Sequence, residues 1–89
     1  MQIELVPDLS HCVETMARKK YQDLARSYIR EGKDDAESQE KIELLRHFLE
    51  TADFRKLRGE SEAYLLKGKK VKFILYREGS ETKYRLIID

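Results

Sequence analysis

Tryptophan and asparagine are absent from this 89-residue sequence, and cysteine and proline occur only once each. The single cysteine, Cys12, excludes an internal disulfide, so we expect a reducing cytoplasm as the location. The four glycines stand far apart, which excludes a glycine-rich loop that cradles phosphate groups. No apolar run approaches the roughly 20 residues needed to cross a bilayer, and we expect no membrane partner.

The overall composition is that of a folded, nearly neutral protein. Hydrophobic residues make up 40% of the chain and charged residues 39%, which is too apolar for a disordered chain. The 18 basic and 17 acidic residues nearly balance, and this excludes a histone-like polycation. We expect one domain over residues 1–89, because a second domain would have no core of its own. Abundant charges with few amide side chains are also typical of thermophilic proteins.

The first long element is predicted to be a helix from about Leu9 to Glu31. Asp8 offers a residue that favours helix starts, and Gly32 offers a residue that favours helix ends. Between them apolar side chains recur at steps of three and four residues, which places them on one face of a helix. The residues on this face are Leu9, Val13, Met16, Ala17, Tyr21, Leu24 and Tyr28.

A second helix is predicted to begin near Asp34 and Asp35, whose carboxylates favour the positive end of a helix. Its apolar spacing predicts a core face made of Ile42, Leu45, Phe48, Leu49 and Ala52.

A third helix is expected after Asp53, which is a favourable N-cap, and it would close at Gly68. Its predicted inner face consists of Phe54, Leu57, Ser61, Tyr64 and Leu65. No glycine or proline separates it from the preceding helix, so one bent helix is an alternative to two.

Beyond Gly68 the apolar period changes from 3.6 to 2, which indicates strands. Gly79 and Ser80 separate the two alternating stretches and suit a type II′ hairpin turn. The expected register pairs Leu75 with Tyr84, Phe73 with Leu86 and Val71 with Ile88. The sequence therefore predicts an α+β fold, with two or three N-terminal helices packed on a C-terminal antiparallel β-hairpin. Residues 2–6 are a candidate third strand.

No arrangement typical of catalysis or metal binding stands out. His11 and Cys12 are neighbours and would point about 100° apart on a helix, unlike a metal site. His47 is expected to project into solvent. The acidic pairs lie in charge-rich stretches without an apolar wall that would raise a carboxyl pKa for acid–base work. We therefore predict a non-enzymatic protein without a metal, cofactor or small-molecule substrate.

The second face of the predicted hairpin is unusually apolar. Ile74, Tyr76 and Ile87 would share it, whereas a solvated outer face is normally more polar. Net charge also alternates in sign along the chain, being negative over residues 1–16 and 34–50 and positive over residues 17–33 and 51–70. Both observations favour a non-catalytic interaction module that forms a homodimer in a prokaryotic cytoplasm, with these three residues as the self-association surface.

The alternative hypothesis is a nucleic-acid-binding protein that uses a basic helix face. Lys19, Arg26 and Arg30 would lie on the first helix opposite its apolar face, and clustered cations are typical of phosphate binding. A second basic set, which would join them if folding brings the two together, contains Arg55, Lys69 and Lys70. A solvated face, neutralised by the acidic second helix, explains the same pattern.

Overall fold

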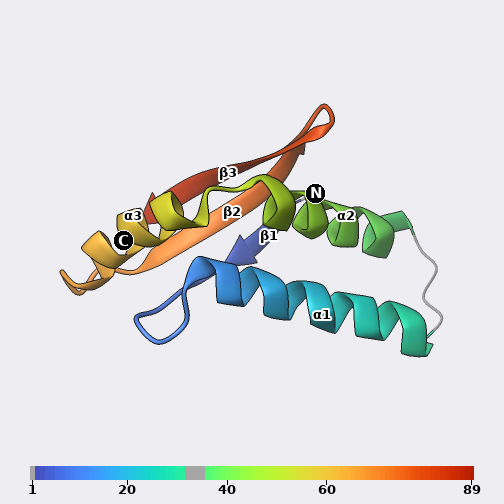
Figure 1. Ribbon diagram of the computed structural model, residues 1–89, viewed down its shortest axis with the longest axis horizontal. Helices are drawn as coiled ribbons and strands as arrows, with labels where there is room; N and C mark the ends of the chain where they lie inside the picture. The colour runs from blue at the N-terminus through green and yellow to red at the C-terminus, as the bar shows by residue number, and fades with distance from the viewer. Residues whose placement is uncertain (1, 32–35) are drawn as a thin grey trace.

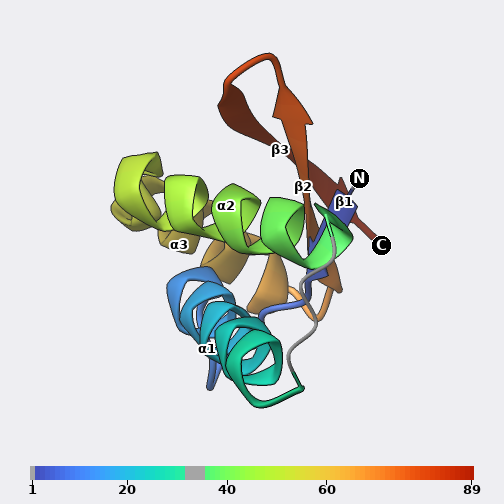
Figure 2. The same ribbon diagram turned by 90° about the vertical axis from the view of Figure 1, so that its right-hand side faces the viewer.

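The computed structural model describes residues 2–31 and 36–89, and its helices all lie on one face of an antiparallel sheet (Figures 1 and 2). This arrangement confirms the predicted α+β fold. None of the described helices is long and apolar enough to cross a membrane. In chain order the elements are β1 (Gln2–Leu5), α1 (Val13–Glu31), α2 (Ala36–Thr51), α3 (Phe54–Leu65), β2 (Val71–Glu78) and β3 (Glu81–Ile88).

The sheet has the strand order β1-β2-β3, so the N-terminal strand lies against the C-terminal hairpin. Ile3 lies opposite Leu75 and Leu5 lies opposite Phe73 in the antiparallel β1–β2 pair. All four of these side chains are buried. The predicted third strand is confirmed, and it makes β2 the central strand while β3 remains an edge.

The hairpin has the predicted register and turn. Leu75 pairs with Tyr84 in this register, and the other two predicted pairs also hold. Gly79 at the turn has a φ of +64°, whereas no non-glycine residue in the described ranges, Ser80 included, has a positive φ. A positive φ at the first central position alone defines a type II′ turn.

Helix α1 begins at Val13, so the prediction of a start near Leu9 was wrong. The Oδ1 atom of Asp8 accepts hydrogen bonds from the backbone N–H groups of Ser10, at 2.8 Å, and His11, at 2.7 Å. These bonds close a local turn ahead of the helix, and they lower the pKa of the Asp8 carboxyl. Leu9 lies in this turn with 62% of its surface exposed, and it does not join the core.

Helices α2 and α3 are separate elements, which answers the question that the sequence left open. The Asp53 carboxylate accepts a hydrogen bond from the Lys56 backbone N–H at 3.2 Å and forms the predicted N-cap of α3. The predicted helix signals at Gly32, Asp34 and Asp35 lie outside the described residues.

The chain leaves α3 through Gly68, as predicted. The Gly68 N–H donates to the carbonyl of Leu65 at 3.0 Å, and the Lys69 N–H donates to the carbonyl of Tyr64 at 3.1 Å. These two bonds form a Schellman motif, which needs a left-handed residue, and Gly68 has a φ of +79°.

The core lies between the sheet and the three helices. Leu44 belongs to it, although it was not on the predicted inner face of α2. Helix α2 contacts both α1 and β3, so it buries more residues than the single apolar face predicted from the sequence. The core residues are Ile3, Leu5, Val13, Ala17, Leu44, Leu45, Phe48, Leu57, Val71, Phe73 and Leu75.

Candidate functional site

No described helix covers the outer face of the sheet (Figure 2). The predicted self-association residues lie on this face. Ile74, Tyr76 and Ile87 share this face because their positions alternate with the buried row of each strand. Ile74 is only 7% exposed, Tyr76 is half-buried and Ile87 is 44% exposed. The three residues therefore do not form one continuous exposed apolar patch.

Charged side chains from neighbouring strands surround Ile74. In the register Glu4 of β1 and Arg85 of β3 flank it on either side. The Arg85 guanidinium lies 5.0 Å from the centre of the Tyr76 ring, and the Lys72 ammonium lies 3.7 Å from the Glu4 carboxylate. Long charged side chains commonly lay their methylene groups over apolar neighbours in this way. Ile87 consequently remains the most exposed apolar residue of the three.

The free edge of β3 lies beside this face. Lys70 and Asp89 exchange two backbone hydrogen bonds, of 3.3 Å and 3.0 Å, so odd-numbered residues of β3 turn their backbone groups towards β2. Because paired and unpaired positions alternate in an antiparallel ladder, the even-numbered residues turn their N–H and C=O groups outward. These outward residues are Thr82, Tyr84, Leu86 and Ile88.

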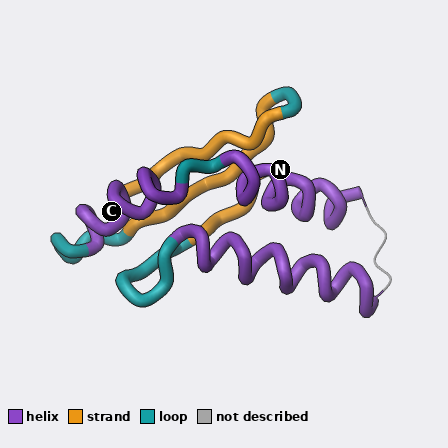
Figure 3. Tube along the Cα trace, in the orientation of Figure 1, coloured by secondary structure: helices purple, strands orange, loops and turns teal. Residues whose placement is uncertain are grey.

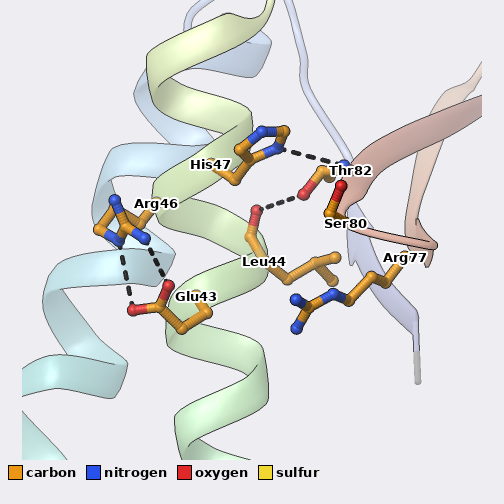
Figure 4. A pocket seen from close by; sticks show the side chains of 7 residues that line it. All are labelled: Glu43, Leu44, Arg46, His47, Arg77, Ser80 and Thr82. Atoms are coloured by element: carbon orange, nitrogen blue, oxygen red, sulfur yellow. Dashed lines mark hydrogen bonds and ion pairs between the residues drawn. The ribbon is translucent and has the colours of Figure 1, made fainter.

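Thr82 meets helix α2 at the hairpin end of this edge (Figure 4). Its backbone N–H donates to Nδ1 of His47 at 3.1 Å, and its Oγ1 donates to the Leu44 carbonyl at 3.1 Å. His47 is thus half-buried against the hairpin, and the prediction that it projects into solvent was wrong. We call this pair of bonds the Thr82 clasp.

A small cavity of about 110 Å³ lies beside the Thr82 clasp (Figure 4). The Arg46 guanidinium donates to the Glu43 carboxylate, and this bond lowers the pKa of that carboxyl. Nδ1 of His47 is occupied by Thr82, and among the described residues no hydrogen bond joins His47 to Ser80. Among the described residues that line this cavity, no hydrogen bond joins a hydroxyl group to a side-chain base, the contact that activates a nucleophile in many enzymes.

Cys12 lies at the start of α1 beside a second cavity of about 400 Å³. Its Sγ is 3.3 Å from Oγ1 of Thr15, and this hydrogen bond lowers the thiol pKa, with a smaller contribution from Arg58. His11 instead contacts Asp8, with Nδ1 and Oδ1 3.3 Å apart. Across residues 2–31 and 36–89 no three His, Cys, Asp or Glu side chains are grouped to hold a metal ion.

The two predicted basic sets are only partly brought together. Arg55 and Cys12 line the same cavity, so Arg55 lies near the start of α1. Lys69 and Lys70 belong to the α3–β2 turn, which lies at the opposite end of the molecule from the end of α1 (Figures 1 and 3). Arg30 in the last turn of α1 is therefore remote from these two lysines.

Comparison with known proteins places the chain in a family. A protein-family model matches residues 1–85. The chain belongs to this family. A relative from Archaeoglobus fulgidus, described as an uncharacterized protein, is 42% identical over 50 residues, which cover 54% of this chain and 59% of the relative. The match thus spans less than two thirds of the relative's length, and no solved structure matches the chain.

Sequence reasoning missed two features of this family member. The Thr82 clasp joins residues 35 positions apart, and no local pattern signals such a contact. The open edge of β3 follows from the strand order β1-β2-β3, because β1 takes the other side of β2. The alternation of Ile3 and Leu5 was the available signal for β1, but it did not specify which edge the strand would join.

Proposed function

We propose that this family member is a non-catalytic interaction module that forms a homodimer in the cytoplasm of a prokaryote. The observation that carries the proposal is the open edge of β3, an eight-residue strand without proline. Natural proteins usually shorten, cover or bend such an edge, since it offers a template for another strand. The archaeal relative and the single cysteine support the prokaryotic and cytoplasmic parts of the proposal.

Ile87 supports a contact surface on β3. It is 44% exposed on the outer face, directly beside the open edge. Ile74 and Tyr76 share the outer face, but both lie on the central strand β2, away from the open edge. An exposed isoleucine next to unpaired backbone groups offers a partner both apolar area and hydrogen bonds.

We expect the purified chain to have a mass near twice 10.6 kDa in light scattering at high concentration. Ile87→Lys should weaken this association, because a charge would replace apolar surface at the contact. Ile29→Lys is the matched control, since Ile29 is 79% exposed on α1 and remote from β3. A strict monomer would refute the proposal, and a dimer lost only with Ile29→Lys would place the interface on the helices.

A second candidate function, nucleic-acid binding, is favoured by the exposure of the predicted basic side chains. All are exposed, and none forms an ion pair with another described residue. Two acids that could have neutralised the basic face of α1 are engaged elsewhere, because Glu37 pairs with Lys41 and Glu43 pairs with Arg46. The unpaired cations are Lys19, Arg26, Arg30, Arg55, Lys69 and Lys70.

The double variant Arg26→Gln/Arg30→Gln should bind duplex DNA or structured RNA more weakly than the wild type. Contacts to about three to six phosphates would make the affinity fall steeply with salt, and the double variant should reduce that slope by about two. The matched control replaces Arg18 and Lys41, which are paired with Glu14 and Glu37. Equal losses in both variants, or no binding by the wild type at low salt, would refute this candidate.

A further inference from the structure

The free edge of β3 carries backbone groups that bind nothing in the part of the chain that the structure describes. His47 occupies the N–H of Thr82, but no described group bonds the outward N–H groups of Tyr84, Leu86 and Ile88. Backbone groups of this kind are satisfied by water or by another strand. The available edge therefore begins after Thr82.

Side chains on both faces of this edge suit a neighbouring strand. Tyr84, Leu86 and Ile88 are half-buried at the border of the core, so a further strand would complete their cover. A groove of about 270 Å³ runs between Tyr84 and the α2–α3 junction, with Phe48 and Leu57 in its wall. On the outer face the exposed residues of the edge are Lys83, Arg85, Ile87 and Asp89.

The β3 sequence is complementary to itself when two copies run antiparallel with Leu86 on the two-fold axis. Lys83 of each copy then lies opposite Asp89 of the other, and Tyr84 lies opposite Ile88. Opposite charges and aromatic–aliphatic pairs are the favourable cross-strand combinations. The outward positions would exchange about six backbone hydrogen bonds. Arg85 would lie opposite Ile87, so that its methylene groups cover the most exposed isoleucine of the face.

Neighbouring two-fold registers are less favourable. An axis at Tyr84 places Lys83 opposite Arg85, and an axis at Arg85 places two copies of that arginine face to face. Like charges directly opposite each other destabilise a strand pair. An axis at Ile87 faces Arg85 with Asp89, but within residues 82–89 it pairs the outward backbone groups of Leu86 and Ile88 alone. Of these registers, the Leu86 axis matches the charges and pairs the outward groups of Tyr84, Leu86 and Ile88 within the same residues.

We infer that a second copy of this chain docks antiparallel on the edge of β3, with the two-fold axis at Leu86, and extends the sheet across both copies. This inference rests on the self-association proposed above and specifies its partner surface. The Thr82 clasp joins α2 to the edge at the hairpin end. The two-fold axis places the two clasps at opposite ends of the paired segment, so they do not obstruct each other.

A charge exchange tests the register in the full chain. Lys83→Glu would set Glu opposite Asp89, and Asp89→Lys would set two lysines opposite each other. Each single variant should raise the dimer dissociation constant roughly tenfold, because two cross-strand pairs per dimer become repulsive. The double variant Lys83→Glu/Asp89→Lys restores opposite charges and should return the constant close to that of the wild type. Sedimentation equilibrium provides the constants, and circular dichroism confirms that each variant is folded.

Two further variants separate the edge from the outer face. Leu86→Pro removes an N–H that binds nothing in the described monomer, so it should weaken dimerisation at least a hundredfold while the fold persists. Tyr76→Lys alters the outer face away from the paired edge and should leave the dimer intact. A dimer that loses stability with Tyr76→Lys but tolerates both charge variants would overturn the edge inference and retain self-association. Failure of the double variant to restore binding would overturn the Leu86 register, and a monomeric wild type would overturn both proposals.

Discussion

Replacing Phe73 with alanine should lower the free energy of unfolding by about 3–5 kcal/mol. Phe73 is fully buried on the central strand, between Leu5 of β1 and Leu86 of β3. Its ring centre lies 5.8 Å from that of Tyr84, in a tilted aromatic contact. Truncation would leave a cavity that both neighbouring strands and the helices border, and such a cavity closes only partly. The loss is a large share of the stability of a domain this small.

Urea denaturation followed by circular dichroism measures this change. Ile29→Ala is the control, because Ile29 is mostly exposed on α1 and its truncation should change stability by no more than about 0.5 kcal/mol. Equal losses for the two variants would contradict the packing that the structure assigns to Phe73.

Replacing His47 with alanine should lower the free energy of unfolding by about 1–2 kcal/mol, mainly by freeing the hairpin end. The variant deprives the Thr82 N–H of its acceptor, Nδ1 of His47, and also removes a half-buried ring that packs beside the hairpin. The Thr82 side chain would still donate to the Leu44 carbonyl, so the Thr82 clasp weakens without being abolished. Amide hydrogen exchange at Thr82 should become faster.

His47→Asn is the matched variant for this experiment, because its Oδ1 can take the place of Nδ1 as the acceptor. We expect it to retain most of the exchange protection at Thr82. Unchanged protection in His47→Ala would contradict the role assigned to the imidazole.

The sequence predicted the elements whose signals are local. The Gly79–Ser80 turn fixes the hairpin register, and Asp53 and Gly68 mark the ends of α3, because backbone preferences at these positions depend on few neighbours. The start of α1 was predicted wrongly because the local signal at Asp8 fits two structures. Asp8 can cap a helix or close a separate turn, and only the three-dimensional structure shows which of the two occurs.

The candidate surface was less predictable because it depends on distant contacts. Alternation placed Ile74 and Ile87 correctly on one face, but their exposure differs sharply. Ile74 lies on the central strand with neighbours on both sides, whereas Ile87 lies at the edge. Which strand becomes central depends on where β1 docks, and this choice has no local signature in the sequence.

The position of β1 also has a consequence for synthesis. Ile3 emerges from the ribosome before the three helices, while its partner Leu75 emerges only after them. While the helices are synthesised, β1 therefore has apolar side chains without the strand that will cover them, a state in which exposed strands can associate wrongly. Its length of four residues and the exposed Gln2 and Glu4 between the apolar positions limit that hazard. The β1–β2 pair can therefore form only after β2 has been synthesised, whether or not β3 is yet in place.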